Sequence, residues 1–345
     1  QQLDVDGYQH QEYLHSRVES LPIDRAVDVE GNPVVVQVDT RSGPILAQVW
    51  RMSVGRVNLY LLDSDVDGNT PEDRELTSRL YGGDTRVRIR QELVLGIGGV
   101  KAIRAMGITP GVYHLNEGHS AFATLEAIRG RMDRDGYSYD EAVRRVARQT
   151  VFTTHTPVPA GHDRFDGGLV EEHLGPMRDA LGISHDHLMS LGRVETHNHD
   201  EPFCMTVLAL KLSRRANAVS ALHGHVSRRM WNSLWPAREE EEVPIGHITN
   251  GVHVPSWLSW QMLQLYDRIF PSGWFRRMGE PDVWQKIYDV DSGELWETHY
   301  ALKNLLLQFV RRRLARQCRR RGECDEAVEQ ARTVLDPNIL TIGFA

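Results

Sequence analysis

The spacing of hydrophobic and polar positions changes along this chain of 345 residues. In residues 34–62, β-branched and apolar residues alternate or cluster around glycines, which is typical of antiparallel strands. From about residue 86, strand-like runs alternate with helical ones, and this alternation predicts a parallel sheet covered by helices on both faces. After Val252 the pattern is mainly helical up to residue 332. We therefore expect an α/β fold with an antiparallel β portion near the start.

The run VYHLNEGHSAF at residues 112–122 leads from an apolar strand-like segment through a polar turn into a helix. Asn116 is predicted to cap that helix, so that Glu117 and His119 lie in its first turn. The helix dipole favours a carboxylate there, and the imidazole can reach a ligand at the carboxyl end of the strand. The alternative is an ordinary helix cap with two solvated polar side chains.

Three further segments show the same transition from a strand-like run into Gly, His, Asn and Pro: VFTTHTPVPAGHDRF (151–165), ANAVSALHGHVSRRMW (216–231) and GHITNGVHVPSWL (246–258). His155 and His162 alone lack the further ligands that a zinc site needs, so no metal site is predicted. Asn250 belongs either to a plain Asn-Gly turn or to a site in which its amide both donates and accepts hydrogen bonds.

The glycines of the segment Gly96-Ile97-Gly98-Gly99 suggest a dinucleotide motif, but Lys101 stands where the third glycine belongs. We interpret the segment as a tight turn into the following helix.

Composition narrows the class of protein. A net charge of −7 argues against nucleic acid as a partner, because a phosphate backbone calls for a basic surface. No apolar run approaches the roughly 18 residues that a membrane span needs, so no membrane partner is expected either. With only three cysteines a disulfide framework is excluded, and a reducing, cytoplasmic location is expected.

Together these motifs resemble the bacterial α-glucan phosphorylases, the glycogen and maltodextrin phosphorylase family. The opening QQLDVDGYQHQEY and the segment RVRIRQELVLGIGGVKAIRAMGI (86–108) share the resemblance. It implies a GT-B-like fold, in which two Rossmann-type domains face each other. It also implies an allosteric, homo-oligomeric glycosyltransferase that cleaves terminal α-1,4 bonds of a glucan with inorganic phosphate, giving glucose 1-phosphate with retained configuration.

The resemblance also assigns roles to individual residues. His155 is implied as the catalytic residue facing the transferred glucosyl unit, and Asn250 as the partner of a primary sugar hydroxyl. Asn116, Glu117 and His119 are implied to line the same substrate site. Three positions depart from the family pattern: Cys204, Ala218 and His225. Ala218 stands where glycine is expected and would be strained if its φ were positive.

The family's cofactor is pyridoxal 5'-phosphate, and the resemblance implies that its lysine is not in this chain. Residues 1–250 are expected to be part of the N-terminal phosphorylase domain. Residues 251–345 are expected to be the helical start and, with NILTIGFA (338–345), the first strand of a truncated cofactor domain. We thus expect an internal fragment that is inactive alone. A non-catalytic glucan-binding module and a related GT-B glucosyltransferase remain alternatives.

Overall fold

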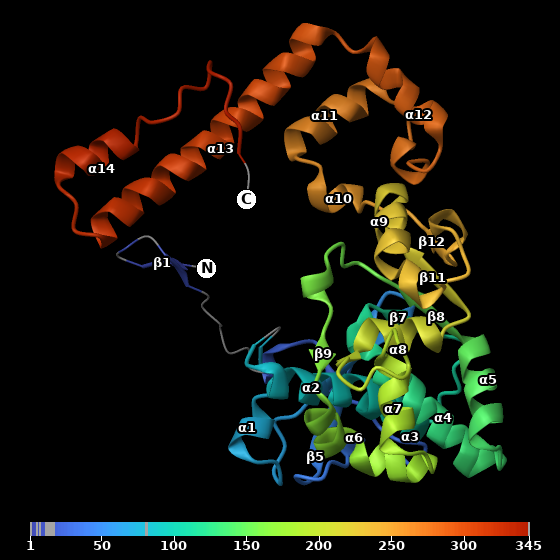
Figure 1. Cartoon of the computed structure of the whole chain (residues 1–345). Helices are drawn as coiled ribbons and strands as arrows, with labels where there is room; N and C mark the ends of the chain where they lie inside the picture. Colours follow the sequence, from blue (N-terminus) through green and yellow to red (C-terminus); the bar gives the residue numbers. More distant parts are fainter. Residues whose placement is uncertain (1, 5, 7, 11–17, 80–81, 344–345) are drawn as a thin grey trace. The chain divides into compact units, whose positions relative to one another are not determined.

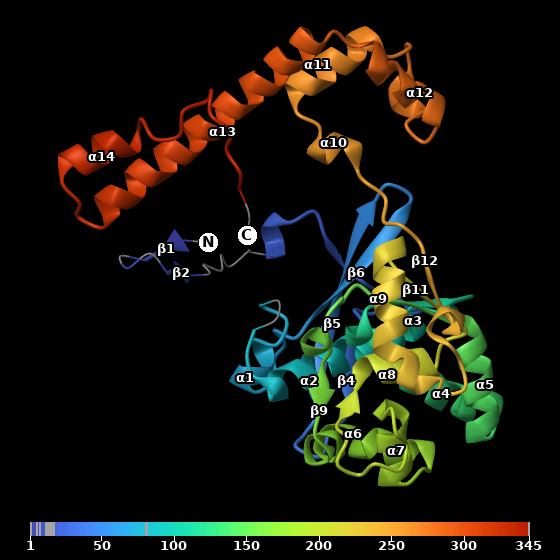
Figure 2. The ribbon, with the colours of Figure 1, turned by 45° about the horizontal axis from the view of Figure 1, so that its top comes forward.

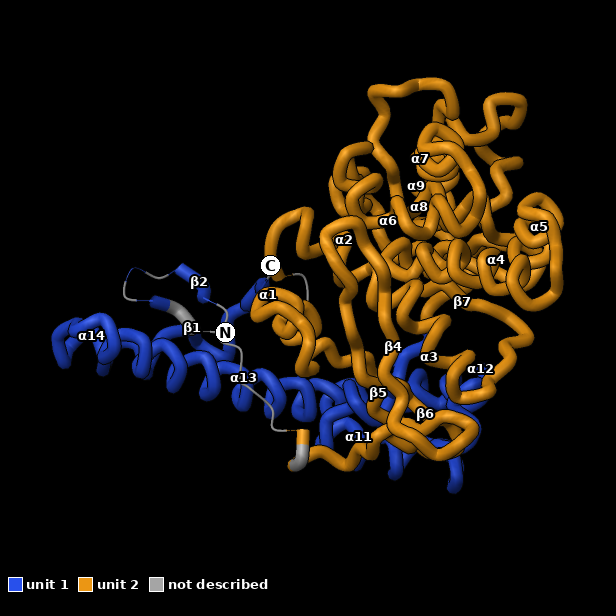
Figure 3. Tube along the Cα trace, turned by 90° about the horizontal axis from the view of Figure 1, so that it is seen from below, with its two compact units in different colours: residues 1–14, 251–345 blue, residues 15–250 orange. Residues whose placement is uncertain are grey.

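The computed structural model describes residues 2–4, 6, 8–10, 18–79 and 82–343. The chain divides into two compact units, one of residues 15–250 and one that combines residues 1–14 with 251–345 (Figure 3). The division falls between Asn250 and Gly251, within the TNGV segment. Residues 1–14, which the domain prediction placed with the larger unit, group with the later part of the chain instead.

A four-stranded parallel sheet organises the larger unit (Figure 1). Its strands lie in the order β12 (Ile245–His247), β11 (Arg215–Ala218), β8 (Thr150–Thr153) and β7 (Tyr113–Asn116), and all three pairings are parallel. The connections between successive strands are helical, through α4 (Phe122–Asp135) and α5 (Tyr139–Gln149), then α6 (Gly167–Leu181), α7 (His185–Gly192) and α8 (Met205–Lys211), then α9 (Ala221–Trp231). The predicted α/β fold with a parallel sheet is confirmed.

The expected antiparallel portion is also present. The long strand β5 (Ile45–Val54) pairs with β3 (Asp24–Arg25), β4 (Val35–Val38) and β6 (Val57–Asp63), always antiparallel. Figure 2 shows the β5–β6 hairpin. Along β4 the exposed and buried positions alternate, as in a strand with one face on a core.

The segment of Gly96, Gly98 and Gly99 is helical, so the predicted tight turn is wrong. One helical run continues from α2 (Thr85–Leu93) through the π-helical η2 (Val94–Gly98) into α3 (Gly99–Ala105). A Cβ atom at Gly96 would lie 2.7 Å from the backbone nitrogen of Ala123 and 2.9 Å from the Cβ of Phe122. The glycine therefore serves close packing of η2 against the start of α4.

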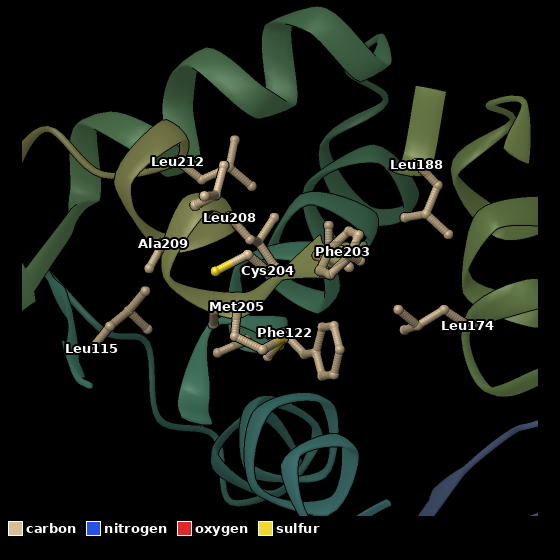
Figure 4. Close-up of a cluster of buried hydrophobic side chains, with 14 of the residues drawn as sticks. Leu115, Phe122, Leu174, Leu188, Phe203, Cys204, Met205, Leu208, Ala209 and Leu212 are labelled. Atoms are coloured by element: carbon tan, nitrogen blue, oxygen red, sulfur yellow. The ribbon is translucent and has the colours of Figure 1, made fainter. Parts of the chain in front are cut away.

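The main hydrophobic core lies between the parallel sheet and the helices of the larger unit. Figure 4 shows Phe122, Phe203 and Cys204 among its side chains, and the centroids of the two phenyl rings are 6.1 Å apart. Cys204 follows Phe203 in β10 (Phe203–Cys204), which pairs antiparallel with β9 (Arg164–Phe165). Burial raises the pKa of the Cys204 thiol, so this departure from the family pattern is a packing residue.

The smaller unit is mainly helical, as predicted. It contains α10 (Val254–Trp257), α11 (Trp260–Ile269), α12 (Pro281–Gln285), α13 (Ser292–Arg320) and α14 (Asp325–Ala331), with the short antiparallel pair β1 (Gln2–Leu3) and β2 (Gln9–His10). Tyr266, Phe270, Trp274 and Trp284 form an aromatic cluster. None of the helices among the described residues is both long and apolar enough to cross a bilayer.

The predicted final strand is not formed in its described part, residues 338–343. Ile339, Leu340 and Ile342 are exposed, and no described strand pairs with them. The apolar pattern was interpreted correctly as β-prone, but a strand needs a neighbour to satisfy its backbone. Residues 344–345 lie outside the described residues.

Candidate functional site

The carboxyl ends of the four parallel strands bring the predicted site segments to one edge of the sheet. Asn116 at the end of β7 is in register with Thr153 of β8, and Thr153 is in turn in register with Asn217 of β11. Ala218 is in register with His247 of β12. Parallel α/β sheets bind ligands beyond this edge of their strands. The prediction that the strands around residues 112–115 and 151–155 lie side by side is confirmed.

Glu117 connects the loops that follow β7 and β8. Its carboxylate accepts hydrogen bonds from the backbone N–H of His155 (2.7 Å), the hydroxyl of Thr156 (2.8 Å) and the backbone N–H of Gly118 (3.1 Å). Its own backbone N–H donates to the carbonyl of Thr153 (2.8 Å). We call this set of contacts the Glu117 clamp.

Glu117 is only 8% exposed and has φ 69° and ψ 170°. A side chain with positive φ is strained, and the clamp's hydrogen bonds hold it there. Glu117 thus precedes η3 (Gly118–Ser120) rather than lying in a helical turn, and the preceding Asn116 ends β7 instead of capping a helix. Those two local predictions are wrong, because the loop's hydrogen bonds to β8 override the capping preference.

His155 has a fixed backbone and an exposed side chain. The residue before it is also held, since the N–H of Thr154 donates to the carbonyl of Asn217 (3.0 Å). Among the described residues, no side chain or backbone group hydrogen-bonds to the imidazole of His155. The ring is therefore available to a ligand on a rigid backbone.

Asn250 reaches the same edge from β12. Its N–H donates to the carbonyl of Val219 (3.0 Å), and the N–H of Ile248 donates to the carbonyl of Ala218 (2.9 Å). These bonds hold the segment after β12 against the end of β11. The side chains of both Asn250 and Asn116 are exposed and can contact a ligand.

His119 belongs to a group of four ionisable side chains that the sequence analysis did not anticipate. Its Nδ1 lies 3.1 Å from Asp163 and 3.5 Å from the buried Glu92. The guanidinium of Arg88 donates to Asp163 (3.1 Å) and to Glu92 (3.2 Å). We call Arg88, Glu92, His119 and Asp163 the charged cluster.

The charged cluster shifts the pKa values of its members in different directions. Burial raises the pKa of Glu92 to about 8. Hydrogen bonds to Asp163 and Glu92 raise the pKa of His119 to about 9. Although burial opposes it, hydrogen bonds with His119, Glu92 and Arg88 hold the pKa of Asp163 well below its usual value. At neutral pH, therefore, Glu92 carries a proton, His119 is cationic and Asp163 is anionic.

This arrangement is not suited to a metal ion. Ligand atoms of Glu92, His119 and Asp163 lie within 4.8 Å of one another, which is close enough to share a cation. However, the Nη2 atom of Arg88 lies within 3.2 Å of all three atoms and already supplies the positive charge. The high pKa of His119 also keeps a proton on the nitrogen that a metal would need.

The remaining departures from the family pattern are accommodated structurally. Ala218 is not among the described residues with positive φ, so the strain considered for it does not arise. His225 makes an ion pair with Glu240 (3.0 Å). Asn217 uses its side-chain oxygen to accept a hydrogen bond from Thr153 (3.1 Å), within the sheet.

The lysines of this chain do not fit pyridoxal phosphate. Lys101 donates to the carbonyl of Gln37, Lys211 to those of Ser190 and Arg193, and Lys303 to that of Ile339, while Lys286 pairs with Asp289. A lysine that forms an imine must present a free neutral amine next to a phosphate-binding turn. The glycines nearest to Lys101 are helical and form no such turn.

Comparison with known proteins supports the resemblance drawn from the motifs. No family model matches the chain. The glycogen phosphorylase of Mycobacterium tuberculosis is 43% identical over 359 residues, covering 100% of this chain and 41% of that protein. The maltodextrin phosphorylase of Thermococcus litoralis is 37% identical (100% and 40%), and the glycogen phosphorylase of Aquifex aeolicus is 34% identical (100% and 49%). The chain thus spans between two fifths and half the length of these relatives.

Proposed function

We propose that this chain, which is homologous over its whole length to glycogen and maltodextrin phosphorylases, forms the sugar-binding side of an α-glucan phosphorylase. The reaction is phosphorolysis of a terminal α-1,4 bond, with inorganic phosphate as co-substrate and glucose 1-phosphate as the product of retained configuration. The observation that carries the proposal is the Glu117 clamp. It fixes the backbone of His155 at the sheet edge to which Asn250 also belongs.

Each exposed group at this edge has a chemical task. Sugar hydroxyls both donate and accept hydrogen bonds, so the amide of Asn250 can bind one hydroxyl in both directions. The His155 imidazole and the neighbouring backbone carbonyls face a glucosyl group that becomes positively charged as its bond breaks. Fixed dipoles at such a point stabilise the transition state more than the bound substrate.

The structure argues for a revised role of Glu117. Its carboxylate already accepts three hydrogen bonds and is buried, so it has little capacity left for a substrate hydroxyl. In the proposal it is a positioning residue for His155, while Asn116 and the partly exposed His119 line the site.

The chain's own residues supply only part of the reaction. Pyridoxal phosphate provides acid–base chemistry through its phosphate in this family, and no lysine here fits it. The proposal therefore includes a GT-B-like partner half that carries the cofactor, in a cytoplasmic and oligomeric enzyme. For the chain by itself, the lysine contacts favour glucan binding without turnover.

Calorimetric titration of the chain with maltoheptaose tests the proposal. Asn250→Ala and His155→Ala should each weaken binding about tenfold, because a buried hydrogen bond to the sugar is worth roughly 1–3 kcal/mol when one partner is removed. Asn58→Ala, an exposed position in β6, is the matched control and should bind like the unmodified chain. Equal affinity of all four proteins would remove the assignment of the sugar site.

A further inference from the structure

A cavity of about 420 Å³ in the smaller unit is lined almost entirely by arginines. It lies where the last turns of α13 meet the end of α14 and is separate from the sugar-side residues, which belong to the larger unit. Its lining includes Arg311, Arg312, Arg316, Arg319 and Arg332, with the buried Ala315 among them.

The cavity is assembled from two segments. The residues from α13 are spaced three or four positions apart and share one face of the helix. Arg332, at the C-terminal cap of α14, closes the cavity from the other side. The guanidinium of Arg311 donates to the carbonyls of Val334 (2.7 Å) and Leu335 (2.8 Å), which holds the segment after Arg332 against α13.

The positive charge of the cavity is poorly compensated. Arg332 pairs with Glu329 at 3.3 Å. Within the described ranges, no carboxylate lies at ion-pair distance from Arg311, Arg312, Arg316 or Arg319. Arg312 and Arg316 are four residues apart on one helix, and like charges at that spacing destabilise a helix. A bound anion relieves this repulsion.

We propose that this arginine-lined cavity binds a phosphate dianion, carried by inorganic phosphate or by a phosphate monoester. Guanidinium groups match phosphate oxygens with paired, charge-assisted hydrogen bonds, which few other anions accept as well. The volume lies within the range of small-molecule sites, and the Ala315 methyl offers an apolar contact for the organic part of an ester.

Calorimetric titration of the full chain with inorganic phosphate and, separately, with phenyl phosphate tests the inference. Both probes should bind, and binding should weaken as salt is added. Arg316→Gln combined with Arg319→Gln should lower the affinity at least tenfold for both. Tighter binding of phenyl phosphate than of phosphate identifies a monoester as the better ligand, whereas equal binding identifies the phosphate group alone; either supports the site.

The matched control combines Arg229→Gln with Arg320→Gln, which removes two charges from exposed positions outside the cavity. The control should bind both probes as the unmodified chain does. The inference is overturned if neither probe binds, if the two double variants lose affinity equally, or if the Arg316/Arg319 variant binds normally. Because no glucan is involved, these results are independent of the proposed phosphorylase function.

Discussion

At the scale of single residues, Glu117 decides the geometry of the candidate site. We predict that Glu117→Gln leaves the fold intact but loosens the loop after β8, because an amide cannot accept from both His155 and Thr156 as the carboxylate does. Hydrogen exchange at the backbone amide of His155 should accelerate at least tenfold. Glu141→Gln, an exposed position in α5, is the control. Unchanged protection of His155 in the Glu117 variant would show that the clamp does not hold this loop.

The charged cluster makes stability depend on pH. The pKa of Glu92 rises from 4.5 to about 8 on folding and that of His119 from 6.5 to about 9, so the folded chain keeps protons that the unfolded chain releases. This contribution is complete below the unfolded pKa values and is lost as pH rises through the folded ones. We predict a decrease of about 2–4 kcal/mol in the free energy of unfolding between pH 6 and roughly pH 9.

Urea unfolding at a series of pH values measures this decrease. Glu92→Gln should flatten the curve, since glutamine stays neutral at every pH and resembles the protonated carboxyl. A variant curve as steep as that of the unmodified chain would place the responsible groups outside the charged cluster.

Only some of these residues could be predicted from the sequence. Asn116, Glu117, His155 and Asn250 stood out because each follows a strand-like run, and topology brings such positions to one edge. Arg88 and Asp163 did not, because they lie 31 and 75 residues from their partners along the chain. The i,i+4 spacing of Arg88 and Glu92 was the one local signal for them.

At the scale of elements, Gly96 and Gly98 in η2 provide a matched pair. A Cβ at Gly96 would meet the backbone of Ala123 at 2.7 Å, whereas a Cβ at Gly98 would be 3.5 Å from its nearest neighbour. We predict that Gly96→Ala destabilises the chain by about 1–3 kcal/mol, because the backbone of α4 must move. Gly98→Ala should be neutral or stabilise by up to about 1 kcal/mol, as alanine favours helices. Equal unfolding midpoints for the two variants would contradict the close packing of η2 on α4.

Local pattern predicted the type of most elements but failed where contacts outweigh it. The glycines at 96–99 indicated a turn, yet packing against α4 requires their lack of side chains inside a helix. At residues 338–343 the apolar pattern indicated a strand, yet no described strand is adjacent to pair with it. In both cases the deciding partner is distant in sequence.

At the scale of the whole molecule, the division between Asn250 and Gly251 separates the sugar-side residues from the helical unit. We predict that the chain does not form an imine with pyridoxal phosphate at any one lysine, since each ammonium already has a carbonyl or carboxylate partner. Incubation with the cofactor, borohydride reduction and intact-mass measurement should show no stoichiometric label. One fully labelled lysine would show that a cofactor site had been overlooked.

The central claim is that the edge formed by β7, β8, β11 and β12 holds the terminal glucose of an α-glucan. A crystal structure of the chain soaked with maltoheptaose tests it most directly. The account predicts that a glucose unit lies within hydrogen-bond distance of the Asn250 amide and contacts His155, with Glu117 still bonded to the His155 backbone. A glucan bound only elsewhere, with this edge of the sheet occupied by solvent, would contradict the account.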